Sequence, residues 1–294
     1  MTMTEQLNAL GSILAQGSLH SLFQPIICLS ERRILGYEAL SRGPSNSPLH
    51  SPVALFSVAS HAGRLSELEM ACRESACRRF SEQKLPGKLF LNISPESLME
   101  TAHQPGRTLQ LLRDFGIPPS QVVIELTEQT PTDDFDLLQT ALHHYRDMGF
   151  AIALDDLGAG YSSLRLWSEL RPDYVKIDRH FIDGIHQDAL KREFVGSILQ
   201  IAKASRAQVI AEGIELPEEL AVLTEMGVDL VQGYLLCRPQ EQPPQEARLM
   251  LPKQDHTNIT LNEEGSDLSA LLNEQPAVDQ DTATAQVLES FRRQ

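Results

Sequence analysis

The chain has 294 residues, of which 41% are hydrophobic, and its 40 acidic residues against 25 lysines and arginines give a formal charge of −15. This composition supplies enough apolar side chains for a large core and excludes a wholly disordered chain. The acidic balance also argues against broad electrostatic binding to a DNA or RNA polymer, and a phosphate-handling site in such a chain would need bound cations.

Short apolar segments bounded by turn residues predict eight β-strands. In chain order they are residues 22–26, 34–40, 89–93, 122–126, 151–155, 174–177, 208–211 and 230–234. Helical periodicity lies between most of them, in residues 51–83, 133–148, 188–205 and 216–226. Pro217 suits a first helical turn and Gly227 suits a helix end.

Strands that alternate with helices predict an α/β fold, a (βα)8 TIM barrel with a parallel sheet. The first link breaks the pattern, because only residues 27–33 separate the first strand from the second. A parallel crossover needs about a dozen residues or more, whereas an antiparallel hairpin needs far fewer. We therefore expect a modified barrel whose first strand is antiparallel.

The composition changes after about residue 250, since residues 251–294 hold eight acidic and three basic residues. We expect a lead-in at residues 1–17, a barrel domain at 18–250 and an acidic linker or tail at 251–294. Short helices are possible in the tail at residues 266–273 and 283–291. Whether this chain is part of a larger multidomain protein is a question that the sequence leaves open.

The sequence contains no uncharged apolar run of 18 residues, which predicts no membrane span. Its first ten residues lack the basic and apolar regions of a signal peptide. The four cysteines form no C-x-x-C pair and no zinc-binding spacing with histidine, and a disulfide scaffold is not expected. These features predict a cytoplasmic protein.

Polar side chains stand near the carboxyl ends of seven consecutive predicted strands, where barrels carry their functional groups. One acid at a strand end is usually a turn residue, but seven strands with such a residue at comparable positions predict a site. The residues concerned are Glu38, Asn92, Glu125, Asp155, Asp156, Lys176, Glu212 and Gln232.

Most of these side chains offer oxygen atoms, the ligands that Mg²⁺ and Mn²⁺ prefer. Converging carboxylates without cations would repel one another. The adjacent Asp155 and Asp156 could serve two metals roughly 3.5–4 Å apart, an arrangement that supports in-line phosphoryl displacement. Lys176 would add a cation near the phosphate, although a purely structural ion pair with the acids stays an alternative, as does a backbone-satisfying role for Asn92.

A glycine-rich segment, DDLGAGYSSL, follows the fifth predicted strand. Its glycines, Gly158 and Gly160, could cradle a phosphate, but their spacing matches no common nucleotide-binding motif. A mobile lid or hinge is the better interpretation. His143 and His144 are predicted to lie on a helix surface.

Motifs in a fixed order run from residue 23 to residue 239, almost the whole predicted barrel. They are FQPI (23–26), GYEALSRG (36–43), LNIS (91–94), IELTE (124–128), LDDLGAGYSSL (154–164), VKID (175–178), AEGIE (211–215) and VQGYLLCRP (231–239). Together they resemble EAL-domain cyclic di-GMP phosphodiesterases. The resemblance implies a modified TIM barrel with an antiparallel first strand, two Mg²⁺ or Mn²⁺ ions per site, hydrolysis of cyclic di-GMP to linear pGpG by hydroxide attack, and a homodimer.

The resemblance also implies individual roles. One metal would be held by Glu38, Asn92, Glu125 and Asp155, and the second by Asp155, Asp156 and Glu212. The catalytic groups would be Lys176, which contacts the attacking water, with Glu212 and Glu38. Substrate contacts would be Gln24, Arg42, Asp178 and Gln232, and the loop-positioning acids would be Glu128 and Glu215.

This sequence departs from the usual D-D-F-G-T-G segment of the family at Leu157 and Ala159. Neither position is an implied metal ligand, but both changes could weaken the ordering of the loop. A catalytically silent receptor for cyclic di-GMP is the main alternative, and a protein-interaction scaffold is a second one. The complete set of metal-ligand positions favours the enzyme.

Overall fold

A computed structural model of the chain describes residues 2–99, 105–127, 135–158 and 163–251. The chain divides into two units, Met1–Lys253 and Gln254–Gln294, and the described residues all lie in the first. No helix in the described ranges combines the length and the apolar character required to cross a membrane.

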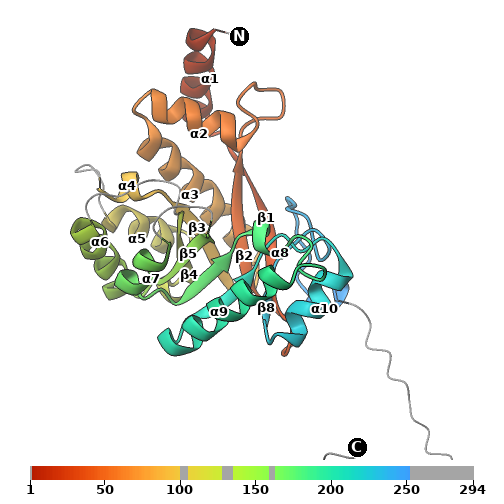
Figure 1. Cartoon of the computed structure of the whole chain (residues 1–294). Helices are drawn as coiled ribbons and strands as arrows, with labels where there is room; N and C mark the ends of the chain where they lie inside the picture. The colour runs from red at the N-terminus through yellow and green to blue at the C-terminus, as the bar shows by residue number, and fades with distance from the viewer. Residues whose placement is uncertain (1, 100–104, 128–134, 159–162, 252–294) are drawn as a thin grey trace, which may run out of the picture. The chain divides into compact units, whose positions relative to one another are not determined.

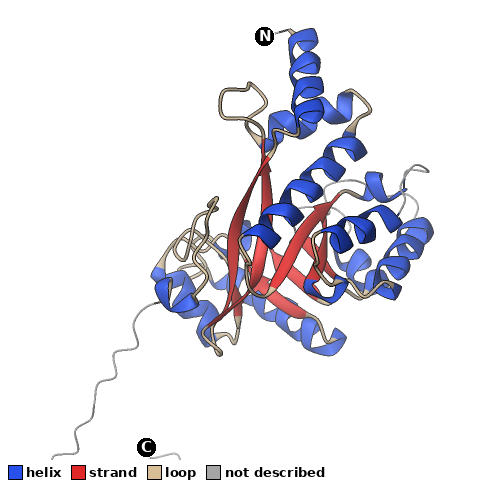
Figure 2. Ribbon diagram, turned by 180° about the vertical axis from the view of Figure 1, so that it is seen from behind, coloured by secondary structure: helices blue, strands red, loops and turns tan. Residues whose placement is uncertain are grey.

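Eight strands in the described part of the chain close into a barrel in sequence order, and Figures 1 and 2 show them surrounded by helices. The predicted α/β barrel is therefore confirmed. The strands are β1 (His20–Cys28), β2 (Arg33–Arg42), β3 (Lys88–Ile93), β4 (Val122–Thr127), β5 (Ala151–Leu157), β6 (Tyr174–Ile177), β7 (Gln208–Ala211) and β8 (Leu230–Val231).

The first strand runs antiparallel to both of its neighbours, β2 and β8, while the other neighbouring pairs are parallel. This confirms the hairpin predicted from the short link. Asp229, just before β8, fixes the hairpin turn by accepting hydrogen bonds from the Ser30 backbone N–H at 2.8 Å and from its hydroxyl at 2.9 Å. The reversed strand places Gln24 opposite Glu38, at the barrel end where the parallel strands finish.

Helices precede the first strand and follow most of the others. They are α1 (Met3–Gln16), α2 (Pro52–His61), α3 (Leu65–Glu82), α4 (Pro95–Met99), α5 (Pro105–Asp114), α6 (Phe135–Asp147), α7 (Ser163–Leu170), α8 (Arg179–Ile182), α9 (Ala189–Ser205) and α10 (Pro217–Glu225), with short 3-10 turns η1 (Pro119–Gln121) and η2 (Ala247–Leu249). The predicted helix start at Pro217 is confirmed, and Gly227 takes a left-handed φ of 85° after the end of α10.

Two element predictions were wrong in extent. The predicted helical segment 51–83 is two helices, because Gly63 between them takes a φ of +63° that ends the first. The predicted strand 230–234 stops at Val231. Gly233 lies against the backbone of Ile214, where an added Cβ would come within 2.1 Å of its carbonyl oxygen, and the chain turns away there.

A small apolar cluster joins α1, α2 and α3, with Leu10, Leu55 and Leu68 among its fully buried side chains. Figure 1 shows α1 and α2 beyond the end of the barrel at which β1 begins and β2 ends. Because β2 is parallel to β3, this is the end where the parallel strands finish. The lobe formed by α1 and α2 therefore stands next to the predicted site.

Candidate functional site

The side chains inside the barrel change from apolar to polar within two residues along the parallel strands. Successive side chains of a strand point to opposite faces, so residues two apart share the interior. One interior layer is apolar: Ile26, Cys28, Leu35, Phe90, Val123, Ala153, Tyr174, Ile210 and Leu230. Two residues further toward the carboxyl ends of the parallel strands come Asn92, Glu125, Asp155, Lys176, Glu212 and Gln232. We call these six, with Gln24 and Glu38 from the hairpin, the polar layer.

Lys176 lies at the centre of the polar layer with 1% of its surface exposed. Its Nζ is 2.7 Å from Glu212 Oε1, 2.9 Å from Glu125 Oε1, 2.9 Å from Asp155 Oδ1 and 3.3 Å from Glu38 Oε2. Four carboxylates predicted for the site are thus brought together around the ammonium group of Lys176.

Burial and mutual repulsion shift the titration of these groups. Burial lowers the pKa of Lys176, but the four surrounding carboxylates outweigh it and hold the pKa well above its usual range. Burial raises the pKa of Glu125 and Glu212 well above the usual range, against the pull of Lys176. Full ionisation of four acids beside one lysine would leave excess negative charge in a desolvated space, so the layer requires protons or cations.

Hydrogen bonds fix the orientation of Glu38. Its Oε2 accepts from the side-chain amide of Gln232 at 2.9 Å, and its Oε1 accepts from that of Asn92 at 3.2 Å. Gln232 also donates to Gln24 at 3.1 Å, and Gln24 donates to the backbone of Cys237 at 3.0 Å. Burial alone would raise the pKa of Glu38, but Lys176 and the hydrogen bonds from Gln232 and Asn92 hold it below its usual range.

Asp156 shares the cavity with Asp155 because the strand is irregular at this point. Consecutive side chains of a regular strand would point to opposite faces. Here the pairing of β5 with β6 shifts register between Leu154 and Leu157, and Asp156 takes a left-handed φ of 54°. Such bulges redirect side chains next to functional sites.

The donor set fits hard divalent cations. Oxygen atoms of Asp155, Asp156 and Glu212 lie within 4.8 Å of one another, which matches the triad predicted for one metal. Glu125 Oε2 and Gln232 Oε1 are buried without a hydrogen-bond partner. Buried acceptors of this kind are costly unless a donor or a cation satisfies them, and carboxylate and amide oxygens suit Mg²⁺ or Mn²⁺.

A cavity of about 280 Å³ opens above the polar layer. Its lining includes Gln24, Asp156, Asp178 and Glu215, all predicted for the site. Asp178 begins α8 by accepting the backbone N–H of His180 at 2.8 Å. Glu215 pairs with Arg179 at 3.0 Å.

Arg42, a predicted substrate contact, lines a different cavity of about 560 Å³ together with Asn92. It stands four residues past Glu38 on β2, which is roughly 13 Å along a strand. Leu40 lines both this cavity and the carboxylate cavity, so the two adjoin along β2. Glu128, Ala159 and Gly160 lie outside the described residues.

Sequence reasoning missed three charged residues at the cavities. Arg179 directly follows the VKID motif and reaches the cavity because α8 turns over the end of β6. Glu69 and Arg73 are buried on α3 beside the larger cavity. The sequence signal that could have revealed Glu69 and Arg73 was this pair of opposite charges, four residues apart on an otherwise apolar face of the predicted helix.

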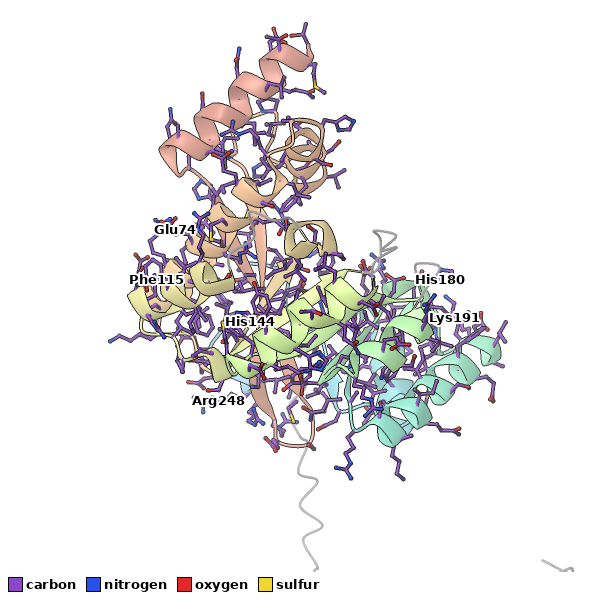
Figure 3. The ribbon with its side chains drawn as sticks, turned by 90° about the vertical axis from the view of Figure 1, so that its left-hand side faces the viewer. Glu74, Phe115, His144, His180, Lys191 and Arg248 are labelled. Carbon is purple, nitrogen blue, oxygen red and sulfur yellow. The ribbon has the colours of Figure 1, made fainter. Side chains whose placement is uncertain are left out.

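The histidine prediction is confirmed, since His143 and His144 are exposed on α6, and Figure 3 shows His144 at the surface.

The sequence matches the EAL domain family over residues 6–239, and the chain belongs to this family. Among curated proteins, it is 33% identical over 198 residues to the cyclic di-GMP phosphodiesterase PdeF of Escherichia coli, a match covering 66% of this chain and 26% of that protein. The chain spans about a quarter to a third of the length of the first curated relatives that it matches.

Two solved structures are similar in fold and sequence. Klebsiella pneumoniae BlrP1, in a complex with calcium and cyclic di-GMP, has a TM-score of 0.71 and 31% identity over 76% of this chain and 56% of that chain. A standalone versatile EAL protein from Vibrio cholerae, in its c-di-GMP-bound form, has a TM-score of 0.70 and 30% identity over 78% of this chain and 95% of that one.

Proposed function

We propose that this chain is a metal-dependent phosphodiesterase that hydrolyses cyclic di-GMP to linear pGpG. The observation that carries the proposal is the polar layer, in which four carboxylates converge on Lys176 beneath an open cavity. The relatives add the substrate class, because PdeF is named a cyclic di-GMP phosphodiesterase and BlrP1 is complexed with that nucleotide.

The metal ligands proposed for one ion are Glu38, Asn92, Glu125 and Asp155, and those for a second ion are Asp155, Asp156 and Glu212. Two divalent cations would supply charge neutralisation and a lowered pKa for the attacking water. Manganese in another BlrP1 complex with the nucleotide supports Mn²⁺ as one suitable ion.

The residues themselves bind and orient the reactants. Water adds to one phosphorus, the bond from phosphorus to the 3′ oxygen breaks, and that oxygen takes a proton to become a hydroxyl group. Lys176, whose pKa the surrounding carboxylates raise, is assigned the role of a positive charge beside the phosphate and the incoming water. Gln24, Asp178 and Gln232 line the cavity, which supports the proposal that they contact the nucleotide.

Other features of the chain stay predictions. Arg42 is proposed to contact the nucleotide from the neighbouring cavity, and Glu128 and Glu215 to position loops. A homodimer, a cytoplasmic location, and the domain bounds 18–250 and 251–294 rest on the resemblance and the composition.

Chromatography of cyclic di-GMP incubated with the full chain tests the proposal. We expect pGpG with Mn²⁺ or Mg²⁺ and intact nucleotide with chelator alone. Intact nucleotide in every condition would contradict it. A binding titration on the same sample would then distinguish a silent receptor, which binds cyclic di-GMP, from a scaffold, which does not.

A further inference from the structure

Glu219 is a buried acid outside the polar layer. It lies in the first turn of α10 with 1% of its surface exposed. Its Oε1 accepts the backbone N–H of Gly184 at 2.9 Å, and its Oε2 accepts those of Glu215 and Leu216 at 3.0 Å each. Three charge-assisted hydrogen bonds to one carboxylate form a strong and specific contact.

The two oxygens of Glu219 hold two different loops. Gly184 follows α8, the helix that continues from β6 and therefore from Lys176. Glu215 and Leu216 belong to the loop that follows β7 and begins with Glu212. One side chain thus links the segments after the two strands that supply the closest ion pair of the polar layer, Lys176 with Glu212 at 2.7 Å.

The loop that begins with Glu212 is also in contact with Arg179 of α8. A Cβ on Gly213 would lie 2.5 Å from the Arg179 side chain, which therefore packs directly on the loop. The ion pair between Arg179 and Glu215 adds a second link between α8 and the same loop. In Figure 1, α8 and α10 lie on the same side of the barrel, as these contacts require.

We propose that Glu219 is a positioning residue that sets the place of Glu212 as a metal ligand relative to Lys176. It is not among the residues that line the cavity, and its hydrogen bonds go to the two loops, so it acts through them. The catalytic part of this inference rests on the proposed function, whereas the metal-binding part can be tested separately. Groups that orient metal ligands typically change metal affinity or activity 10–100-fold when they are removed.

The test compares Glu219→Gln with Glu218→Gln in the full chain. Both variants remove one negative charge from the first turn of α10, but Glu218 is exposed. The glutamine at 219 keeps one acceptor and turns an NH₂ group toward a backbone donor. Mn²⁺ binding is measured by electron paramagnetic resonance without nucleotide, and kcat and KM with cyclic di-GMP.

We expect Glu219→Gln to bind Mn²⁺ about tenfold more weakly and to lose kcat by a similar factor, with KM changed less. Glu218→Gln should match the wild type in all three. Should Glu219→Gln fail to fold, Glu219→Asp replaces it, because it keeps the charge but is too short to reach Gly184 and Leu216 together, and the same weakening is expected.

A lowered melting temperature with wild-type Mn²⁺ affinity would overturn the inference, because it would make Glu219 merely structural. Wild-type protein that binds Mn²⁺ without hydrolysing the nucleotide would overturn the proposed function instead, and leave the comparison of variants intact. Hydrolysis by the wild type with equal Mn²⁺ affinity in both variants would overturn only the role of Glu219.

Discussion

The two interior layers of the barrel lie two residues apart on the same strands, yet they have opposite physical character. The apolar layer contains closely packed rings, such as Phe90 and Tyr174 with centroids 5.6 Å apart in an edge-to-face contact. The polar layer contains buried ions, with Lys176 among four carboxylates. Burial stabilises the first layer through the hydrophobic effect and penalises the second through desolvation.

This difference separates stability from function within one barrel. The apolar layer and the hairpin turn beside it hold the strands in register, and the polar layer uses that rigid frame to keep like charges close together. Functional sites of this kind cost stability that the rest of the fold must offset. Substitutions in the two layers should therefore have opposite effects on activity and on stability.

The largest expected effect is on activity, from Glu38→Gln. This change removes a proposed metal ligand and should lower kcat for cyclic di-GMP hydrolysis on the order of 10²–10³-fold. Glu31→Gln makes the same chemical change in the exposed turn of the same hairpin and should leave kcat unchanged. Comparable rates for the wild type and Glu38→Gln would contradict the assignment of Glu38 to the site.

In the apolar layer, Phe90→Ala should lower the free energy of unfolding by about 3–5 kcal/mol, because it leaves a cavity at a fully buried position. Urea unfolding measures the change. Phe194→Ala on α9 removes a ring that is 49% exposed and contacts Phe181, and it should cost at most about 1 kcal/mol. Equal losses in the two variants would show that the apolar layer is not a special source of stability.

Neutralising one acid of the polar layer should raise the free energy of unfolding, which is the opposite of the effect expected in the apolar layer. Burial raises the pKa of Glu125 well above its usual range, so at neutral pH the folded state must either hold a buried charge at Glu125 or take up a proton, and either costs free energy. Glu125→Gln should raise the free energy of unfolding in chelator by about 1 kcal/mol or more while reducing Mn²⁺ binding. Glu193→Gln on the exposed face of α9 should change neither quantity. A clear loss of stability in Glu125→Gln would contradict the description of the layer as electrostatically strained.

The smallest effect concerns the hairpin turn at the amino end of the parallel strands. Asp229→Asn weakens the hydrogen bonds to Ser30 and should cost about 1 kcal/mol at neutral pH with unchanged kcat. Partial desolvation raises the pKa of the exposed Asp229, but hydrogen bonds from Ser30 and Cys28 outweigh it, so the net pKa lies below the ordinary 3.8. The stabilising contribution is therefore complete above pH 3.8 and is lost as the pH falls further. A gap between wild type and variant that widened in acid would contradict this assignment.

Patterns within short stretches of the sequence were sufficient to predict the strands and the hairpin that carry the site residues. Their places near the carboxyl ends of predicted strands put Glu125 and Lys176 at the same end of the barrel, and the short link before Ile34 required the antiparallel hairpin. The convergence of these side chains follows from barrel closure, which strand count and helical spacing already indicated. The position of polar residues at the carboxyl ends of predicted strands therefore carried most of the information on the polar layer.

Other features depended on contacts between distant segments. Periodicity does not record the left-handed φ of Asp156, nor the end of β8 at Val231, two residues before Gly233 packs against the backbone of Ile214. Arg42 lies along β2 beyond the polar layer, so its motif did not reveal that it faces another cavity. Glu219 meets Gly184 across 35 residues of sequence, and no local signal marks that pairing.

The most direct test of the account is the position of bound Mn²⁺ in crystals of the full chain, located by anomalous scattering. We predict two peaks in the polar layer, one contacted by Glu38 and Glu125 and the other by Asp156 and Glu212, with Asp155 between them. Well-diffracting crystals with manganese elsewhere, or with none in the layer at saturating Mn²⁺, would contradict the claim that this layer is a two-cation site.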